Sequence, residues 1–310
     1  MVDIDDFIKN DKGQQEIDVY LKMLRQKADE VLRPLAETYY PLMIEYDNAD
    51  EFKKMRELST KMMLVGKACA EISDYEFNDK LIMLSALFGG CCFLGDSFID
   101  DYDEEDTLDY IYRLERFLTK GWFEIKDDRE KLFYVIVTRI FTECNVFEER
   151  TRQAIFGQFL AQKRDALWRL DPTELISLSH DEKIDALFQC ANDRGGYVTL
   201  VLSLILTQGL SLSHQHILYL AGELFMHIDD HGDHHQDKYN NRYTYMNSID
   251  KPAHKLEKLF KDIISKIKTG LPENNGRDIL VNFLTRYYYT RLKKHVLEQN
   301  RGDTRWVVYE

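Results

Sequence analysis

Apolar residues recur along most of the chain at the three- and four-residue spacing of amphipathic helices, and period-two alternation is rare. One such run is Ile17, Tyr20, Leu21 and Leu24, and another is Leu81, Leu84 and Phe88. Repeated turn clusters at the short spacing of a β-sandwich are missing. The pattern predicts an all-α protein of about ten helices.

Turn-forming residues mark short connections between the predicted helices. These connections lie at 47–50, 103–107, 171–172, 211–213, 249–252 and 270–276. No low-complexity linker and no repeat divides the chain, and apolar segments are spread over its whole length. We therefore expect one α-helical domain over residues 1–310, built as a single bundle around a central cavity.

Composition and charge exclude several classes of protein. Glycine and proline number 15 and 5 in 310 residues, and 44% of the residues are hydrophobic, which excludes collagen-like and disordered chains. The formal net charge of −13 repels a phosphate backbone, so we expect no nucleic acid partner.

The cysteines and the apolar runs bear on the compartment. The odd number of cysteines and the lack of CxxC spacing predict a reduced, cytoplasmic protein. The five are Cys69, Cys91, Cys92, Cys144 and Cys190. We find no secretory signal and no apolar run of the 18 or so residues that a membrane span needs, so no integral membrane segment is expected. A homodimer is the assembly to test first, because dimers are the commonest soluble oligomers.

Two predicted helices, at 81–104 and 216–238, are apolar for several turns and then abruptly acidic. A helix that is apolar on all sides is buried, so each should line the centre of the bundle and deliver its acidic end to one mouth of the cavity. Residues four apart share a helix face, which predicts two rows of carboxylates. The first row is Asp96, Asp100 and Glu104, and the second is Asp229, Asp233 and Asp237.

Each row stacks like charges, and no lysine or arginine interrupts either row before Lys238. Carboxylate ligands favour Mg²⁺ or Mn²⁺, whose shells are completed by water and substrate phosphate. Two rows facing one cavity therefore suggest a diphosphate substrate clamped by several ions. The alternative is that both runs are solvated helix ends, which would make the chain a helical interaction module.

The acidic segments resemble the metal motifs of class I terpene synthases. Residues 98–104, which include Asp100, Asp101 and Glu104, resemble the aspartate-rich DDxx(D/E) motif, and residues 229–238 have the spacing of NDxxSxxxE followed by Lys. The resemblance implies a class I terpenoid synthase fold and a set of metal ligands. That set is Asp96, Asp100, Asp101, Glu104, Asp229, Asp233 and Asp237.

The motifs leave the branch of the isoprenoid synthase superfamily open. The second segment also contains the DDxxD of chain-elongating prenyl diphosphate synthases. The first can be read as Asp100-Asp101-xx-Glu104 or as Asp96-xxx-Asp100, and the second register is similar to the DxxxD of squalene and phytoene synthases.

The resemblance implies that three Mg²⁺, for which Mn²⁺ can substitute, bind an allylic prenyl diphosphate and stabilise diphosphate as the leaving group. The carbocation is then cyclised or quenched. Implied diphosphate contacts are Arg194, Lys238, Arg305 and Tyr309. Arg194 precedes a double glycine that we expect to break a helix and let the guanidinium approach the substrate.

Two other enzymatic functions stay open. One is prenyl transfer, by chain elongation or head-to-head coupling, although no basic residue directly follows the first motif and no Gly-Lys-Arg-rich segment is visible near the N-terminus. The other is a His/Asp metal phosphohydrolase, because His227, His231 and His235 are spaced four apart, with His234 beside them.

Overall fold

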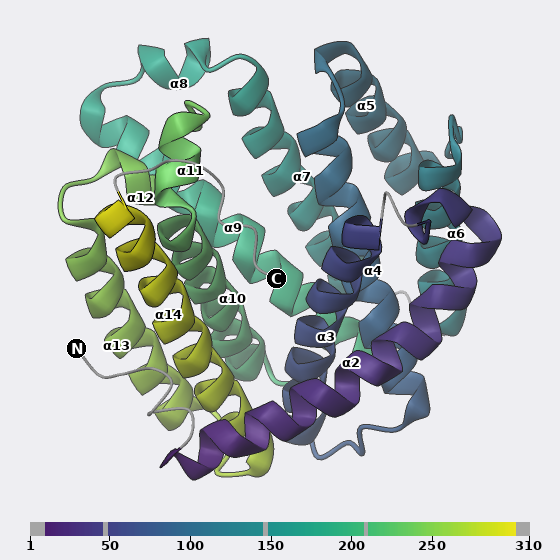
Figure 1. The fold of residues 1–310 in the computed structure, drawn as a ribbon, viewed down its shortest axis with the longest axis horizontal. Coiled ribbons are helices and arrows are strands. Elements are labelled where there is room, and N and C mark those ends of the chain that lie inside the picture. Colours follow the sequence, from purple (N-terminus) through teal and green to yellow (C-terminus); the bar gives the residue numbers. More distant parts are fainter. Residues whose placement is uncertain (1–9, 46–48, 145–147, 208–209, 302–310) are drawn as a thin grey trace.

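The chain is helical throughout the part that this computed structural model describes, which comprises residues 10–45, 49–144, 148–207 and 210–301 (Figure 1). These residues form 13 α-helices and one short 3₁₀ helix, and none of them lies in a strand. The helices are α2 (Lys12–Tyr39), η1 (Pro41–Met43), α3 (Ala49–Ile72), α4 (Asp79–Asp101), α5 (Glu104–Lys120), α6 (Asp128–Glu143), α7 (Glu149–Leu170), α8 (Thr173–Ser177), α9 (His180–Leu206), α10 (Leu212–Gly232), α11 (His234–Tyr239), α12 (Tyr245–Ser248), α13 (Pro252–Gly270) and α14 (Asn275–Arg301).

Four long helices form the inner part of the bundle. Helix α9 packs along α10 and α3 packs along α4, while α7 packs on α9 and α14 contacts both α3 and α10. Helix α2 crosses one side of the bundle against α3, α4 and α14, as Figure 1 shows. One continuous apolar core runs through these helices and includes Leu24, Leu84, Leu224 and Leu284, all of them buried. Burying one such side chain stabilises the fold by about 1.5–3 kcal/mol.

Helix α4 is apolar on all sides and runs through this core. Asn78 caps its start by accepting a hydrogen bond from the backbone N–H of Leu81 at 3.2 Å. Length and composition alone would let α4 cross a membrane, and no other helix in the described ranges passes that test. Half of its most apolar window is buried inside the protein, as in a core helix.

Helix α4 ends at Asp101, earlier than the predicted helix over 81–104. The reason is Asp103, whose side chain accepts a hydrogen bond from the backbone N–H of Asp106 at 3.0 Å and so starts α5 as its N-cap. Glu104 is therefore the first residue of α5 rather than the last of α4. The prediction that Glu104 continues the row of Asp96 and Asp100 on one helix face is wrong.

The second predicted acidic helix is divided at Asp233, where α10 ends and α11 begins. The backbone N–H of Asp233 still donates to the carbonyl of Asp229 at 2.9 Å, and that of Asp237 donates to the carbonyl of Asp233 at 2.9 Å. The helical four-residue spacing is thus kept through the junction. For this reason, Asp229, Asp233 and Asp237 stay on one side despite the division.

The double glycine at 195–196 does not break a helix, so that prediction is also wrong. Helix α9 is continuous from His180 to Leu206 and buries both glycines. A Cβ atom on Gly195 would lie 2.1 Å from the carbonyl oxygen of Gly222, and a Cβ on Gly222 would lie 2.1 Å from that of Gly195. The glycines therefore serve the close crossing of α9 and α10, which only residues without side chains permit.

Candidate active site

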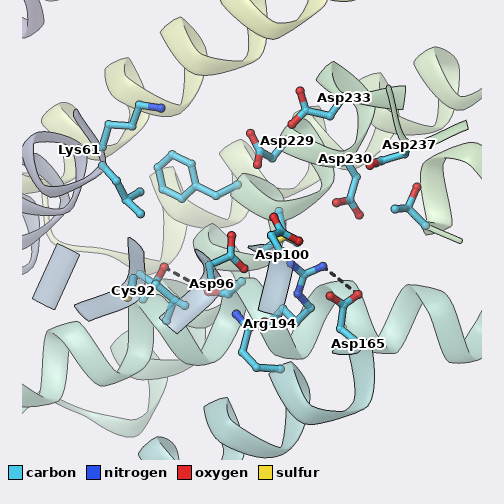
Figure 2. Close-up of a pocket in the computed structure, with 18 of the residues that line it drawn as sticks. Lys61, Cys92, Asp96, Asp100, Asp165, Arg194, Asp229, Asp230, Asp233 and Asp237 are labelled. Atoms are coloured by element: carbon cyan, nitrogen blue, oxygen red, sulfur yellow. Dashed lines mark hydrogen bonds and ion pairs between the residues drawn. The ribbon is translucent and has the colours of Figure 1, made fainter. Parts of the chain in front are cut away.

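A cavity of about 320 Å³ opens at the acidic ends of α4 and α10. Its walls come from α3, α4, α7, α9, α10, α11 and α14. Seven aspartates line it, and Figure 2 shows them gathered around one space. They are Asp96, Asp100, Asp165, Asp229, Asp230, Asp233 and Asp237.

The structure distinguishes the two possible registers of the first motif, because only one of them places both of its residues at the cavity. Asp96 and Asp100, one turn apart, line the cavity. Asp101 points away from it, pairs with Arg129 of α6 at 2.5 Å and keeps 55% of its side chain exposed. Glu104 is exposed at the start of α5 and does not line the cavity. The residues facing the cavity are therefore those of the Asp96-xxx-Asp100 spacing.

Three arginines contact Asp100 and Asp165. They are Arg169, Arg194 and Arg242, and we call them the arginine group. Arg169 pairs with Asp165 at 2.7 Å and with Asp100 at 2.5 Å. Arg194, in the middle of α9, pairs with Asp165 at 3.2 Å. Arg242, which follows α11, pairs with Asp100 at 2.9 Å. The group lines one side of the cavity with fixed positive charge.

A second cationic group lies across the cavity, beside Asp229 and Asp233. We call its members, Lys61 of α3 with Arg291 and Lys294 of α14, the α3/α14 group. Lys61 lines the cavity, and Figure 2 shows it on the side away from Arg194. Arg291 contacts Asp229 and pairs with Asp233 at 3.2 Å, and Lys294 contacts Asp233.

Tyr287 completes the side of the cavity formed by α14. Its hydroxyl donates to Asp229 Oδ1 at 2.5 Å. Arg291, one turn further along α14, donates from Nη2 to the Tyr287 hydroxyl oxygen at 3.1 Å. Tyr287 lines the cavity, whereas Arg291 and Lys294 stand behind the two carboxylates that they contact. The α14 residues therefore fix the orientation of Asp229 and Asp233.

The carboxylates differ in how well their charge is balanced. Burial would raise the pKa of Asp229, but Arg291, the Tyr287 hydroxyl and Lys61 hold it below its usual range. Burial raises the pKa of Asp230 to about 8, with Asp237 and Asp229 adding to the rise and Arg194 opposing it. Burial and the neighbouring Asp233 raise the pKa of Asp237 to about 6. Cationic partners thus favour the charged form of Asp229, whereas burial and neighbouring carboxylates disfavour the charged forms of Asp230 and Asp237.

We expect Asp230→Asn to raise the melting temperature of the metal-free protein by several degrees at pH 8 and by much less at pH 5. The native pKa of Asp230 is about 8, against about 3.9 in the unfolded chain, so native Asp230 keeps a proton that the unfolded chain has lost. Stability therefore falls as pH rises through this window, and asparagine removes that fall. Melting curves at both pH values test this, with the exposed Asp262→Asn as control. A lower melting temperature for Asp230→Asn at pH 8 would contradict it.

The donor set suits Mg²⁺ bound together with a substrate. Every acidic group facing the cavity is an oxygen donor, and several of them lack a cationic partner, which is the chemistry that Mg²⁺ selects. In the described ranges, no three carboxylate, imidazole or thiol groups stand close enough to hold one ion by themselves. Because Mg²⁺ takes one or two protein carboxylates and completes its shell with water and phosphate oxygens, an ion held here would take part of its shell from outside the protein.

Of the four predicted diphosphate contacts, the structure describes two, Arg194 and Lys238. Arg194 lines the cavity and is 8% exposed. Lys238 is exposed on α11 and does not line this cavity, although its neighbour Asp237 does. Arg305 and Tyr309 lie outside the described residues.

Sequence reasoning missed Asp165, Arg169, Arg242, Lys61 and Tyr287 as cavity residues. Asp165 and Arg169 are one helical turn apart, which is a signal that could have placed them together. The expected Arg305 and Tyr309 lie outside the described residues, and within those residues Tyr287 and Arg291 of α14 contact Asp229.

An apolar cavity of about 180 Å³ continues from the acidic one. Both are lined by Cys92, Asp96, Gln162 and Val198, so the two spaces meet at α4, α7 and α9. Aromatic rings from four helices surround the apolar part. They include Phe88, Phe117, Phe133, Phe141 and Phe159.

The histidines that suggested a metal phosphohydrolase do not face the acidic cavity. His227 is fully buried, and its Nε2 lies 2.8 Å from Asn192 Oδ1 while its ring stacks on Phe188. The rings of His231, His234 and His235 each lie within 5.4 Å of the ring of His295, measured between centroids. The geometry therefore gives them no role at the carboxylates that line the cavity.

Comparison with known proteins identifies the fold. No family profile matches this chain, and no curated protein matches it in sequence. Among solved structures, it is similar to the crystal structure of a geranyltransferase from Legionella pneumophila, with a TM-score of 0.50 and 12% sequence identity, over 88% of this chain and 99% of that one. The predicted all-α fold class is confirmed, and the chain has the isoprenoid synthase fold.

Proposed function

We propose that this protein is a Mg²⁺-dependent prenyltransferase that joins an allylic prenyl diphosphate to a second prenyl diphosphate. The observation that carries the proposal is the pair of cationic groups on opposite sides of the seven aspartates that line the cavity. The arginine group lies at Asp100 and Asp165, and the α3/α14 group lies at Asp229 and Asp233. Within the α3/α14 group, Lys61 lines the cavity, while Arg291 and Lys294 hold Asp229 and Asp233 from behind. Cationic side chains thus face the cavity from two sides, which suits two diphosphates, since each diphosphate needs charge-assisted hydrogen bonds of its own.

The reaction breaks the C–O bond between the allylic carbon and its diphosphate, and the bonding electrons leave with diphosphate. Asp96, Asp100, Asp229, Asp233 and Asp237 would hold the Mg²⁺ ions, which neutralise the charge that develops on the departing oxygens. Arg169, Arg194 and Arg242 would orient that diphosphate. The second substrate then forms a C–C bond with the allylic carbon, and a proton is lost.

The apolar cavity would hold the hydrocarbon chain of the allylic substrate. It begins at Asp96, where the acidic and apolar spaces meet, so a diphosphate held by the carboxylates would extend its chain among the phenylalanines. Such walls exclude water, which would otherwise capture the carbocation. The relative whose fold this chain shares is named a geranyltransferase, which supports transfer of a prenyl group.

A second candidate is a terpene synthase that ionises one allylic diphosphate and cyclises it. The ring of phenylalanines around the apolar cavity favours this reaction, because aromatic faces stabilise a carbocation. Cyclisation needs one diphosphate site and leaves Lys61, on the side of the cavity away from Arg194, without a substrate to bind.

Product analysis separates the candidates. The protein is incubated with Mg²⁺ and geranyl, farnesyl or geranylgeranyl diphosphate, each alone and with isopentenyl diphosphate, and the organic extract and released diphosphate are analysed. A longer prenyl diphosphate formed only with isopentenyl diphosphate supports elongation, and a product of doubled chain length from one substrate supports head-to-head coupling. A cyclic hydrocarbon or alcohol from one allylic substrate would replace the proposal by the terpene synthase function, and no turnover at all would contradict both.

Changing Lys61→Gln should raise the KM for the second diphosphate by about 10- to 100-fold, because a charge-assisted hydrogen bond contributes about 1.5–3 kcal/mol. The KM for the allylic substrate should change much less, since the arginine group lies across the cavity. Steady-state kinetics with each substrate varied in turn tests this, and the exposed Lys54→Gln on the same helix is the control. Equal KM values for wild type and Lys61→Gln would remove Lys61 from the proposed second site.

A further inference from the structure

Four histidines form a cluster where α10, α11 and α14 meet. His231 lies in the last turn of α10, His234 and His235 begin α11, and His295 comes from α14. The ring centroid of His295 lies 4.2 Å from that of His231, 4.8 Å from that of His235 and 5.4 Å from that of His234. His234 and His235 are 5.3 Å apart. We call these residues the histidine cluster, and none of them lines the acidic cavity.

Five buried ring nitrogens in the cluster have no hydrogen-bond partner among the residues that the structure describes. His231 is fully buried, and neither its Nδ1 nor its Nε2 is paired. His234 Nδ1, His235 Nε2 and His295 Nδ1 are also buried and unpaired. Each such atom costs about 1–3 kcal/mol relative to a paired one. Five of them in one place, contributed by three helices, point to a ligand that several imidazole nitrogens could share.

The rings carry the lone pairs that such a ligand needs. Burial, with the neighbouring histidines, lowers the pKa of His231 to about 3, and burial with Lys238 lowers that of His234 to about 4. Burial also lowers the pKa of His295. An unperturbed histidine, with a pKa of about 6.5, is already mostly neutral at pH 7, and neutral imidazole is the form that binds metals, so the availability of these lone pairs does not depend on the shifts.

The spacing of the rings also suits a metal ion. Zn–N bonds of about 2.0–2.1 Å in a tetrahedral site put ring centroids about 5 Å apart. Four of the six ring pairs, the pair His234–His235 and the three pairs that include His295, have centroid spacings of 4.2 to 5.4 Å, which lie around that value. As the rings stand, no three ligand groups in the described ranges are set to hold one ion. Binding therefore requires the rings to turn about their side-chain bonds, and His235 and His295 are only partly buried.

We propose that His231, His234, His235 and His295 bind one transition-metal ion of the Zn²⁺ type. Imidazole donors select Zn²⁺, Ni²⁺ or Cu²⁺ over the Mg²⁺ that carboxylates prefer, so this site is distinct from the acidic one. The ion would tie α14 to the α10–α11 junction. Helix α14 carries Tyr287 and Arg291, which contact Asp229, so the site would hold the α14 side of the cavity in place. The proposal does not depend on the reaction proposed above.

Metal binding is measured on the full chain without any prenyl substrate. The protein is loaded with Zn²⁺, or with Co²⁺ as a spectroscopic probe, in excess Mg²⁺ that competes for the carboxylates. Bound metal is counted after dialysis, and the visible spectrum of the Co²⁺ form is recorded. We expect one Zn²⁺ per chain and the strong visible absorption of tetrahedral Co²⁺. His235→Gln and His295→Gln should each weaken binding at least about tenfold, since even loss of an outer-shell partner costs 10- to 100-fold.

Two controls separate this site from other metal binding. His216→Gln changes an exposed histidine of α10 and should leave the affinity unchanged. Asp100→Asn alters the acidic cavity and should also leave the Zn²⁺ count at one, so failure of the proposed reaction would not affect the result. Circular dichroism of the metal-free variants checks their folding. Absence of stoichiometric Zn²⁺ from the wild type, a weakly absorbing octahedral Co²⁺ form, or wild-type affinity in folded His235→Gln and His295→Gln would each overturn the proposal.

Discussion

Asp100→Asn is expected to slow product formation by at least about 100-fold, whereas Asp101→Asn should leave the rate within a few-fold of wild type. The two residues are neighbours on the last turn of α4 and carry the same charge. Asp100 lines the acidic cavity and contacts Arg169 and Arg242. Asp101 lies outside the cavity and pairs with Arg129. Charge that develops on a departing diphosphate is stabilised only by groups that reach it.

The measurement is kcat/KM for the substrate pair that gives product with the wild type, at several Mg²⁺ concentrations. Asp100→Asn should also need more Mg²⁺ for half-maximal rate, because asparagine is a weaker ligand than a carboxylate. Equal losses for the two variants would mean that the Asp100-Asp101-xx-Glu104 register carries the chemistry. A nearly unaffected Asp100→Asn would remove α4 from the metal site.

Gly195→Ala is expected to lower the free energy of unfolding by about 3 kcal/mol or more, at the upper end of what overpacking costs. The new methyl group would lie 2.1 Å from the backbone carbonyl oxygen of Gly222. Backbone cannot rotate out of the way as a flexible side chain can, so α9 and α10 must move apart. Because Arg194 and Asp229 lie on these two helices, activity should fall together with stability.

The matched control is Gly95→Ala on α4, which is also a glycine within a long helix. A Cβ atom there would meet only Phe133 Cε2 and the Tyr110 hydroxyl, both at 3.8 Å, which is ordinary contact. Alanine has a higher helix propensity than glycine by about 0.8–1 kcal/mol, so this variant should be at least as stable as wild type. Chemical denaturation of both variants tests the pair. A Gly195→Ala protein as stable as Gly95→Ala would refute the role assigned to the glycine contact.

Much of the fold was predictable because it depends on local patterns. Apolar periodicity indicates the helices, and the abrupt change from apolar to acidic residues marks the ends of α4 and α10 at the cavity. Asp96, Asp100, Asp229, Asp233 and Asp237 face one space because residues four apart share a helix face. Their role in binding Mg²⁺ stays a prediction.

Other parts of the site depend on local competition that periodicity does not describe. Asp103 can continue α4 or cap α5, and its hydrogen bond to the backbone of Asp106 decides for the cap, which leaves Glu104 on the next helix. The glycines at 195–196 can break a helix or allow two helices to touch. Here they allow two helices to touch, because the backbone of Gly222, which lies 27 residues after Gly195 in the chain, packs directly against Gly195.

The cationic residues of the cavity were the hardest to predict from sequence, since they reach it from distant segments. Arg169 and Arg291 contact Asp100 and Asp229, which only the fold brings near to them, and Lys61 reaches the cavity from α3. A lone lysine in a helix is usually solvated, so no sequence signal singles out Lys61.

The walls of the two joined cavities come from different helices, and this has a practical consequence for protein engineering. Helices α5 and α6 contribute only to the apolar space, through residues such as Leu114 and Phe141, whereas the acidic space takes none of its lining from them. A library of substitutions confined to α5 and α6 can therefore reshape the apolar space, which the proposed function assigns to the hydrocarbon chain of the substrate, without changing any charged side chain that lines the acidic space.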